Sequence, residues 1–110
     1  MLAILHLMRK LQSWQKSMQV RWLNRALKNL DDEAAYIAQE NPLAASEFVA
    51  HVLKSVNQLS IHPGLGRAGR VFGTRELVIT HYSYIVPYRV RADMVEVLRV
   101  FHTSRKWPRS

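Results

Sequence analysis

The chain contains no cysteine and no long apolar run, and each absence narrows what it can do. Without cysteine, the 110 residues form no disulfide, no thiolate metal site and no cysteine nucleophile. No apolar run approaches the roughly 20 residues that a membrane-spanning helix needs, so we expect no membrane partner. The five histidines show no metal-ligand spacing. We therefore expect neither a metal nor another cofactor.

Glycine is scarce, and all four glycines lie between residues 64 and 73. We expect a flexible loop there. The segment 64–69 reads GLGRAG and matches the pattern G-x-G-x-x-G. A dinucleotide-binding loop follows a strand and opens a helix, whereas this segment follows a helical pattern and precedes a strand-like one. The order excludes a dinucleotide site.

Acidic residues are few, which leaves a strongly basic chain. Sixteen lysines and arginines stand against eight acids, giving a net charge of +8. The excess is regional, because residues 61–110 hold nine basic and three acidic residues. Such a patch favours a polyanionic partner, either RNA, DNA or an acidic protein segment. The alternative is a generally basic, soluble surface.

The remaining pattern predicts a single α+β domain. Residues 19–23 form a short strand in this prediction. Apolar residues then recur every three or four positions in two segments separated by Asn41-Pro42, which indicates a helical hairpin. The pattern at 75–80 alternates as a strand, and two further strands flank Ala92-Asp93. The order β-α-α-β-β-β predicts a small antiparallel β-sheet packed on one face by an α-helical hairpin.

The last two strands form a predicted hairpin with arginines on one face. With Ala92 and Asp93 as a two-residue turn, Arg89 lies opposite Glu96, an attractive pair that supports the register. The same register places Tyr84 opposite Phe101. One face of this hairpin then carries Ile85, Pro87, Arg89, Arg91, Leu98, Val100 and His102. We expect this face to contact another macromolecule.

The first 17 residues fit poorly with this plan. Met18 stands immediately before the first predicted strand, so a chain beginning there would contain the whole domain, 18–110. We expect residues 1–17 to be an extension outside the fold. A basic amphipathic segment for a partner and a membrane-surface helix are the two alternatives.

His102 and Arg105 are the candidate catalytic residues. Histidine moves protons near neutral pH, and arginine stabilises charge on a phosphate. In metal-free RNA cleavage the ribose 2′-hydroxyl attacks the adjacent phosphate, which needs only a base, an acid and a cationic clamp. The candidate residues for binding a target or nucleic acid are Tyr84, Tyr88, Arg89, Arg91, Arg105 and Lys106. A capping histidine with arginines that only bind is the competing interpretation.

The whole pattern resembles the RelE/ParE family of bacterial type II toxin–antitoxin toxins. The resemblance runs from residue 18 to 108 and rests on VRWLNRALKNLDDEAAYIAQENPLAA, IHPGLGR and PYRVRADMVEVLRVFHTSRKWP in this order. It implies a cytoplasmic, growth-arresting toxin and a cognate antitoxin that wraps and neutralises it. Within the family, RelE-like members cleave mRNA on the ribosome, and ParE-like members poison DNA gyrase.

The resemblance leaves the mechanism open. RelE-like members have an arginine after the tyrosine that opens the YR-x-x-Y strand motif, but Tyr84 is followed by Ile85. Glu76 and Val78 replace lysines of the preceding strand, while Arg105 matches a functional arginine. The chain is therefore either a gyrase poison, a ribosome-dependent mRNA interferase (a metal-independent endoribonuclease), or an inactive homologue that retains only antitoxin binding.

Overall fold

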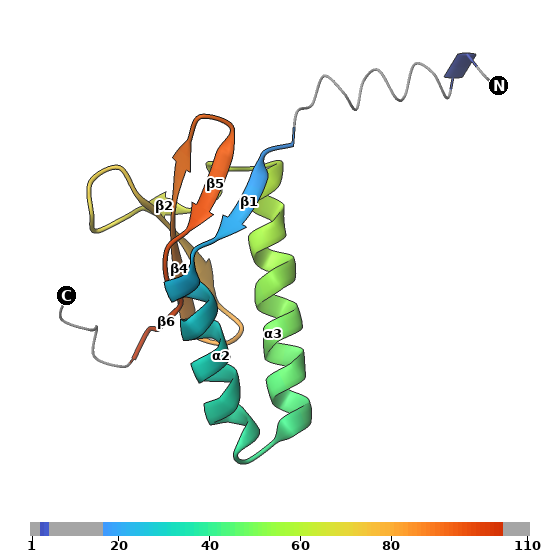
Figure 1. The fold of residues 1–110 in the computed structure, drawn as a ribbon, viewed down its shortest axis with the longest axis vertical. Coiled ribbons are helices and arrows are strands. Elements are labelled where there is room, and N and C mark those ends of the chain that lie inside the picture. The colour runs from blue at the N-terminus through green and yellow to red at the C-terminus, as the bar shows by residue number, and fades with distance from the viewer. Residues whose placement is uncertain (1–2, 5–16, 105–110) are drawn as a thin grey trace.

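A computed structural model describes residues 3–4 and 17–104, and within 17–104 it shows two helices beside one sheet (Figure 1). The order of elements is β1 (Gln19–Trp22), α2 (Asn24–Ala38), α3 (Pro42–Asn57), a 3-10 turn (Gln58–Ser60), β2 (Arg67–Ala68), β3 (Arg75–Ile79), β4 (Tyr84–Arg91), β5 (Met94–Val97) and β6 (Phe101–His102). The predicted α+β arrangement, a helical hairpin on one face of a sheet, is confirmed.

The helical hairpin turns where Asn-Pro predicts it. Asn41 is extended, and its side-chain oxygen accepts a hydrogen bond from the Ala44 N–H at 3.0 Å, which caps α3. Pro42 occupies the first turn of α3, where its missing N–H costs nothing. The two helices then run antiparallel, and their joined ends extend beyond the sheet (Figure 1).

The sheet has the strand order β1-β5-β4-β3-β2, with β6 paired to the other end of β4. The pairs among β2, β3, β4, β5 and β6 are antiparallel, as predicted. The first strand differs, because β1 lies parallel to β5. This parallel pairing places the start of the domain beside its last hairpin.

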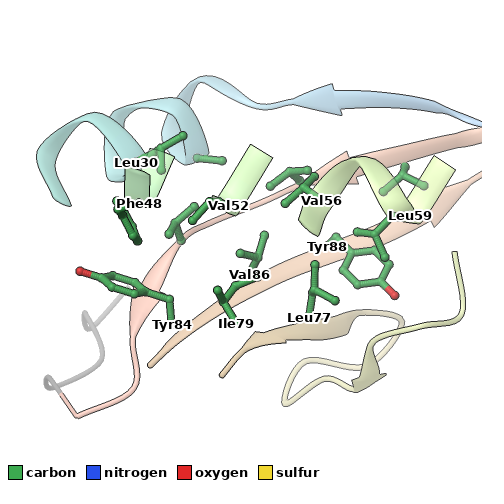
Figure 2. Close-up of a cluster of buried hydrophobic side chains, with 14 residues drawn as sticks. Leu30, Phe48, Val52, Val56, Leu59, Leu77, Ile79, Tyr84, Val86 and Tyr88 are labelled. Atoms are coloured by element: carbon green, nitrogen blue, oxygen red, sulfur yellow. The ribbon is translucent and has the colours of Figure 1, made fainter. Parts of the chain in front are cut away.

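The core lies between α3 and the sheet. Phe48, Val52, Val56 and Leu59 follow one stripe of α3 and its 3-10 extension, and all four side chains are fully buried. Figure 2 shows this stripe facing the strand side chains Leu77, Ile79, Tyr84, Val86 and Tyr88. Because side chains alternate along a strand, the residues between these strand positions point to the opposite face.

An extra residue interrupts the last strand and changes its register. Val97 lies opposite Tyr88, but Phe101 lies opposite Ile85, so four steps on one strand match three on the other. The predicted pairing of Tyr84 with Phe101 is therefore wrong, and Tyr84 instead faces His102. Such a bulge reverses the faces of all residues beyond it.

The extra residue is held by α2. Val100 is buried in the core, and its N–H donates to the Asn29 Oδ1 at 3.2 Å. The prediction that Val100 and His102 share a face with Arg89 is wrong for this reason. The bulge coincides with this contact to a residue 71 positions earlier, a separation that no local residue pattern reports.

The glycine-rich segment is tied to the sheet rather than loosely placed. The Tyr88 hydroxyl donates to the Pro63 carbonyl at 2.6 Å and accepts from the Gly66 N–H at 2.8 Å. Burial raises the pKa of the Tyr88 hydroxyl, which keeps this hydroxyl protonated and able to donate. Arg75 donates to the Gly66 carbonyl at 2.8 Å. The expected loop is present, and these hydrogen bonds tie its first part to β3 and β4.

The prediction for residues 1–17 falls mostly outside the described residues. Within the described residues, the Met18 N–H donates to the Ser60 carbonyl at 2.7 Å, which ties the residue before β1 to the 3-10 turn. Among the helices described, none combines the length and apolar character required to cross a bilayer.

Candidate target-binding face

The sheet face opposite the helices carries alternating arginines and glutamates. Cross-strand pairing aligns Arg21, Glu96 and Arg89 in one row and places Arg67 opposite Glu76 in another. Their strand neighbours Val95, Val97, Leu77 and Tyr88 belong to the core, so the charged residues project away from it. We call the surface formed by Arg21, Arg67, Glu76, Arg89, Arg91 and Glu96 the arginine face.

Two buried glutamates organise the arginine face. The Arg89 Nε donates to the Glu96 Oε1 at 2.7 Å, and the Arg91 Nη1 lies 3.9 Å from the same oxygen. The Glu96 side chain is only 11 % exposed, whereas that of Arg91 is 68 % exposed. The hydrogen bond from Arg89 holds the pKa of the Glu96 carboxyl below its ordinary value. The face therefore presents guanidinium groups with their counter-ions beneath them.

The second glutamate plays the same part at the other side of the face. The Arg67 Nε and Nη2 donate to the Glu76 Oε1 at 3.2 and 3.1 Å. The sequence placed Glu96 opposite Arg89 in advance, but it carried no comparable signal for Glu76. In the sequence, Glu76 stands out only as a departure from the RelE pattern, because its partner Arg67 lies on a two-residue strand that propensity does not reveal.

The predicted binding residues Tyr84 and Tyr88 both point into the core. Tyr88 is fully buried and Tyr84 is 3 % exposed. The Tyr84 hydroxyl donates to the Glu33 Oε1 at 2.7 Å, which ties β4 to α2. Both hydroxyl groups thus hold the fold together in this structure, and Arg89 and Arg91 are the predicted binding residues that it brings to one surface.

His102 lies on the helix side of the sheet, apart from Arg89 and Arg91. Its ring packs edge-on against Tyr84, with 4.9 Å between the ring centroids. The Ser104 N–H donates to the His102 Nδ1 at 3.2 Å. Along β4, the residue opposite His102 is five positions from Arg89, about 17 Å at roughly 3.4 Å per residue. Arg105 and Lys106 lie outside the described residues.

The outer side of the helical hairpin holds a second candidate surface, which the sequence analysis missed. An open groove of about 570 Å³ runs between α2 and α3. It is lined by Asp31, Ala34, Ala35, Ala38, Pro42, Ala45, Ser46, Val49, Ala50 and Leu53. The signal available in advance is the repeated alanine at helical spacing in both helices, since small side chains leave a shallow channel. Across the described residues, no three His, Asp or Glu side chains gather as a metal site would require.

Fold and site together define a small two-layer toxin-like domain with a basic sheet face and an apolar helical groove. The family model for the ParE toxin of the type II toxin–antitoxin system parDE matches residues 20–107. The chain is 45 % identical over 89 residues to toxin Y4kP of Sinorhizobium fredii, covering 81 % of this chain and 92 % of the relative. The chain belongs to the ParE toxin family of type II toxin–antitoxin systems.

Other relatives agree with this assignment. Toxin RelE2 of Caulobacter vibrioides is 33 % identical over 87 residues, covering 79 % of this chain and 97 % of the relative. A chain from the chromosomal ParDE toxin–antitoxin system of P. aeruginosa superposes with a TM-score of 0.74 at 24 % identity, covering 81 % of this chain and 99 % of the other. A chain of the toxin–antitoxin complex RelBE2 from Mycobacterium tuberculosis gives a TM-score of 0.57 at 24 % identity, covering 78 % and 91 %. The two structures support the fold.

Proposed function

We propose that the chain is a growth-arresting toxin that poisons DNA gyrase by binding it, without cleaving nucleic acid. The observation that carries the proposal is the separation of His102 from Arg89 and Arg91 onto opposite faces of the sheet. Phosphate cleavage needs a proton-transfer group within hydrogen-bond reach of the same phosphate that the cations hold. Recognition of a target needs only the arginine face itself.

The second candidate is ribosome-dependent cleavage of mRNA. His102 is half-buried at the end of the sheet, and its ring contacts Tyr84. In that mechanism His102 would move the proton, and Arg105, which lies outside the described residues, is the predicted cationic partner. This candidate demands that His102 be essential for toxicity, whereas the gyrase proposal does not.

A paired assay separates the two candidates. Purified toxin is added to gyrase in a DNA supercoiling assay and, in parallel, to translating ribosomes followed by primer extension on the mRNA. We expect the wild-type toxin to abolish DNA supercoiling and to leave the mRNA intact. We expect the His102→Ala variant to remain fully toxic. We expect Arg91→Glu to weaken gyrase inhibition about fivefold or more, since an exposed ion pair contributes on the order of 1 kcal/mol. Normal supercoiling with excess wild-type toxin would overturn the gyrase proposal.

We also propose that the partner of the chain is a cognate antitoxin that binds the groove between α2 and α3. The apolar, alanine-lined channel fits the apolar stripe of an amphipathic helix, which is a common mode of peptide recognition. An acidic antitoxin would also be attracted to the positive charge of residues 61–110, next to the groove in the fold's other layer. Both proteins would then meet in the cytoplasm, where gyrase and ribosomes work.

The groove is tested by filling it. Ala50 lines the groove and is exposed, so Ala50→Trp adds bulk there without disturbing the core. Asn57→Trp, at the exposed end of α3, is the matched control. Each variant is co-expressed with the cognate antitoxin, to be sought as a small reading frame beside the toxin gene. We expect only Ala50→Trp to stop co-elution and to restore growth arrest. Equal co-elution of both variants would place the antitoxin elsewhere.

A further inference from the structure

The loop between β2 and β3 presents two apolar side chains to solvent. Phe72 is 102 % exposed and Val71 is 68 % exposed. In Figure 1 this loop, coloured yellow, projects from the edge of the sheet well apart from α2 and α3. We call residues 70–73 the Phe72 tip. Two adjacent apolar side chains are thus exposed together at the end of a projecting loop, and the fold itself buries neither of them.

Hydrogen bonds hold the Phe72 tip in one shape. The Gly69 N–H donates to the Thr74 carbonyl at 2.9 Å, and the Thr74 N–H and hydroxyl both donate to the Val71 carbonyl, at 3.1 and 2.6 Å. A methyl group on Gly69 would meet the Thr74 Oγ1, so the two sides of the loop touch directly. Gly73 turns the chain with φ of +81°, a conformation open to glycine.

The base of the loop is anchored by the buried Glu76. Its Oε1 receives two hydrogen bonds from the Arg67 guanidinium, and its Oε2 accepts from the Arg70 N–H at 3.2 Å. Glu76 is 4 % exposed and pairs with Pro87 of the central strand β4. One carboxylate thus joins both ends of the loop to the rigid part of the sheet.

An aromatic side chain held out into water by a hydrogen-bonded loop is suited to act as a binding anchor. Most of the entropy lost on fixing the loop has been lost before a partner arrives, so burying Phe72 contributes directly to affinity. Around the tip, Arg67, Arg70 and Arg75 outnumber the single acid Glu76. The positive charge of these arginines favours an acidic partner surface, and the exposed Phe72 and Val71 favour an apolar pocket, which a phosphate backbone does not supply.

We propose that Phe72 and Val71 insert into an apolar pocket with an acidic rim on the protein target of the toxin. This inference deepens the proposed function and rests on it. It adds a second contact to the arginine face, since Arg67 belongs to that face and its pairing with Glu76 fixes the tip. It also assigns target binding to one side of the molecule and leaves the α2–α3 groove for the antitoxin.

The test compares Phe72→Ser with Leu43→Ser. Leu43 is 69 % exposed and lies at the far end of the helical hairpin, which makes it a matched loss of apolar surface. Growth after induction is measured first, and then inhibition of purified gyrase. We expect Phe72→Ser to lose toxicity and to weaken gyrase inhibition about 30-fold, the effect of removing a central anchor. Leu43→Ser should match wild type, and both variants should still co-elute with antitoxin.

The outcomes separate this inference from the proposal beneath it. Toxicity and gyrase inhibition that survive in Phe72→Ser overturn the inference and leave the proposed function standing. A wild-type toxin that neither arrests growth nor inhibits gyrase overturns both. A photoreactive benzoylphenylalanine at position 72 should crosslink to a purified gyrase subunit, and the same group at position 43 should not. A crosslink to a nucleic-acid oligonucleotide in place of the protein overturns the inference.

Discussion

Charged residues on the same face of this sheet differ in how far their side chains are buried. Glu96 and Arg91 sit on the same face, yet only the carboxylate is enclosed. Desolvation opposes its charge, but the hydrogen bond from Arg89 is the stronger influence, and the pKa of the Glu96 carboxyl is therefore lowered. Charge on the arginine face is thus linked to the stability of the sheet.

This linkage gives a pH-dependent prediction. Because the pKa of Glu96 is lower in the folded chain than its ordinary value of 4.5, the ionised carboxylate stabilises the fold above that value. The contribution is lost as the pH falls through the lowered, folded-state pKa. We expect the urea midpoint of wild type to fall between pH 6 and pH 3 more steeply than that of Glu96→Gln. Parallel curves for the two proteins would contradict the assigned ion pair.

Single residues also show which contacts the sequence could predict. Opposite positions on a regular hairpin are a matter of counting, so Arg89 and Glu96 were placed correctly from their distance to the Ala92-Asp93 turn. Burial of Tyr84 and Tyr88 was missed, because alternation assigns side chains to two faces without saying which one the helices cover. Both tyrosines share the face of Val86 and belong to the core.

At the scale of elements, the glycines between residues 64 and 73 serve close contacts as well as turns. A methyl group at Gly66 would lie 2.6 Å from the Tyr88 Cε1 and 2.9 Å from the Glu76 carbonyl oxygen. At Gly64, nothing lies within 4 Å of the same position. The two glycines are two residues apart in the same loop, so a substitution at Gly64 is a control for the same substitution at Gly66.

Alanine at these positions should have opposite effects. We expect Gly66→Ala to lower the free energy of unfolding by about 1–3 kcal/mol, because a backbone oxygen cannot move aside as easily as a side chain. Gly64→Ala should be neutral or stabilise the chain by up to about 1 kcal/mol, since alanine restricts the unfolded state. Urea denaturation of both variants measures this. If both variants lose a similar free energy of unfolding, the close contact of Gly66 with Tyr88 is not the reason for the loss.

For the molecule as a whole, the first strand closes the fold. β1 lies parallel to β5, the Met18 N–H contacts Ser60, and Trp22 packs against the core. The two ends of the described domain are therefore joined through one strand. Whether the folded unit needs any residue before Met18 is therefore a question that a truncation can answer.

A truncation series answers this question. We expect a chain that begins at Met18 to unfold at the same urea concentration as the full chain, because it retains every contact of β1. A chain that begins at Leu23 lacks β1 and should unfold at a clearly lower concentration, since the core loses the packing of Val20 and Trp22. A lower midpoint for the Met18 chain would show that residues 1–17 contribute to the fold.

The linear order of residues by itself determined the two helices, their Asn-Pro link, the layered fold and the family. These features depend on periodicity, turn chemistry and motifs, which act between near neighbours. Only the tertiary structure decided the bulge before Phe101, the side on which His102 lies and the burial of the two tyrosines. The bulge lies beside the hydrogen bond from the Val100 N–H to Asn29, which joins residues 71 positions apart, so the pattern of neighbouring residues could not predict it.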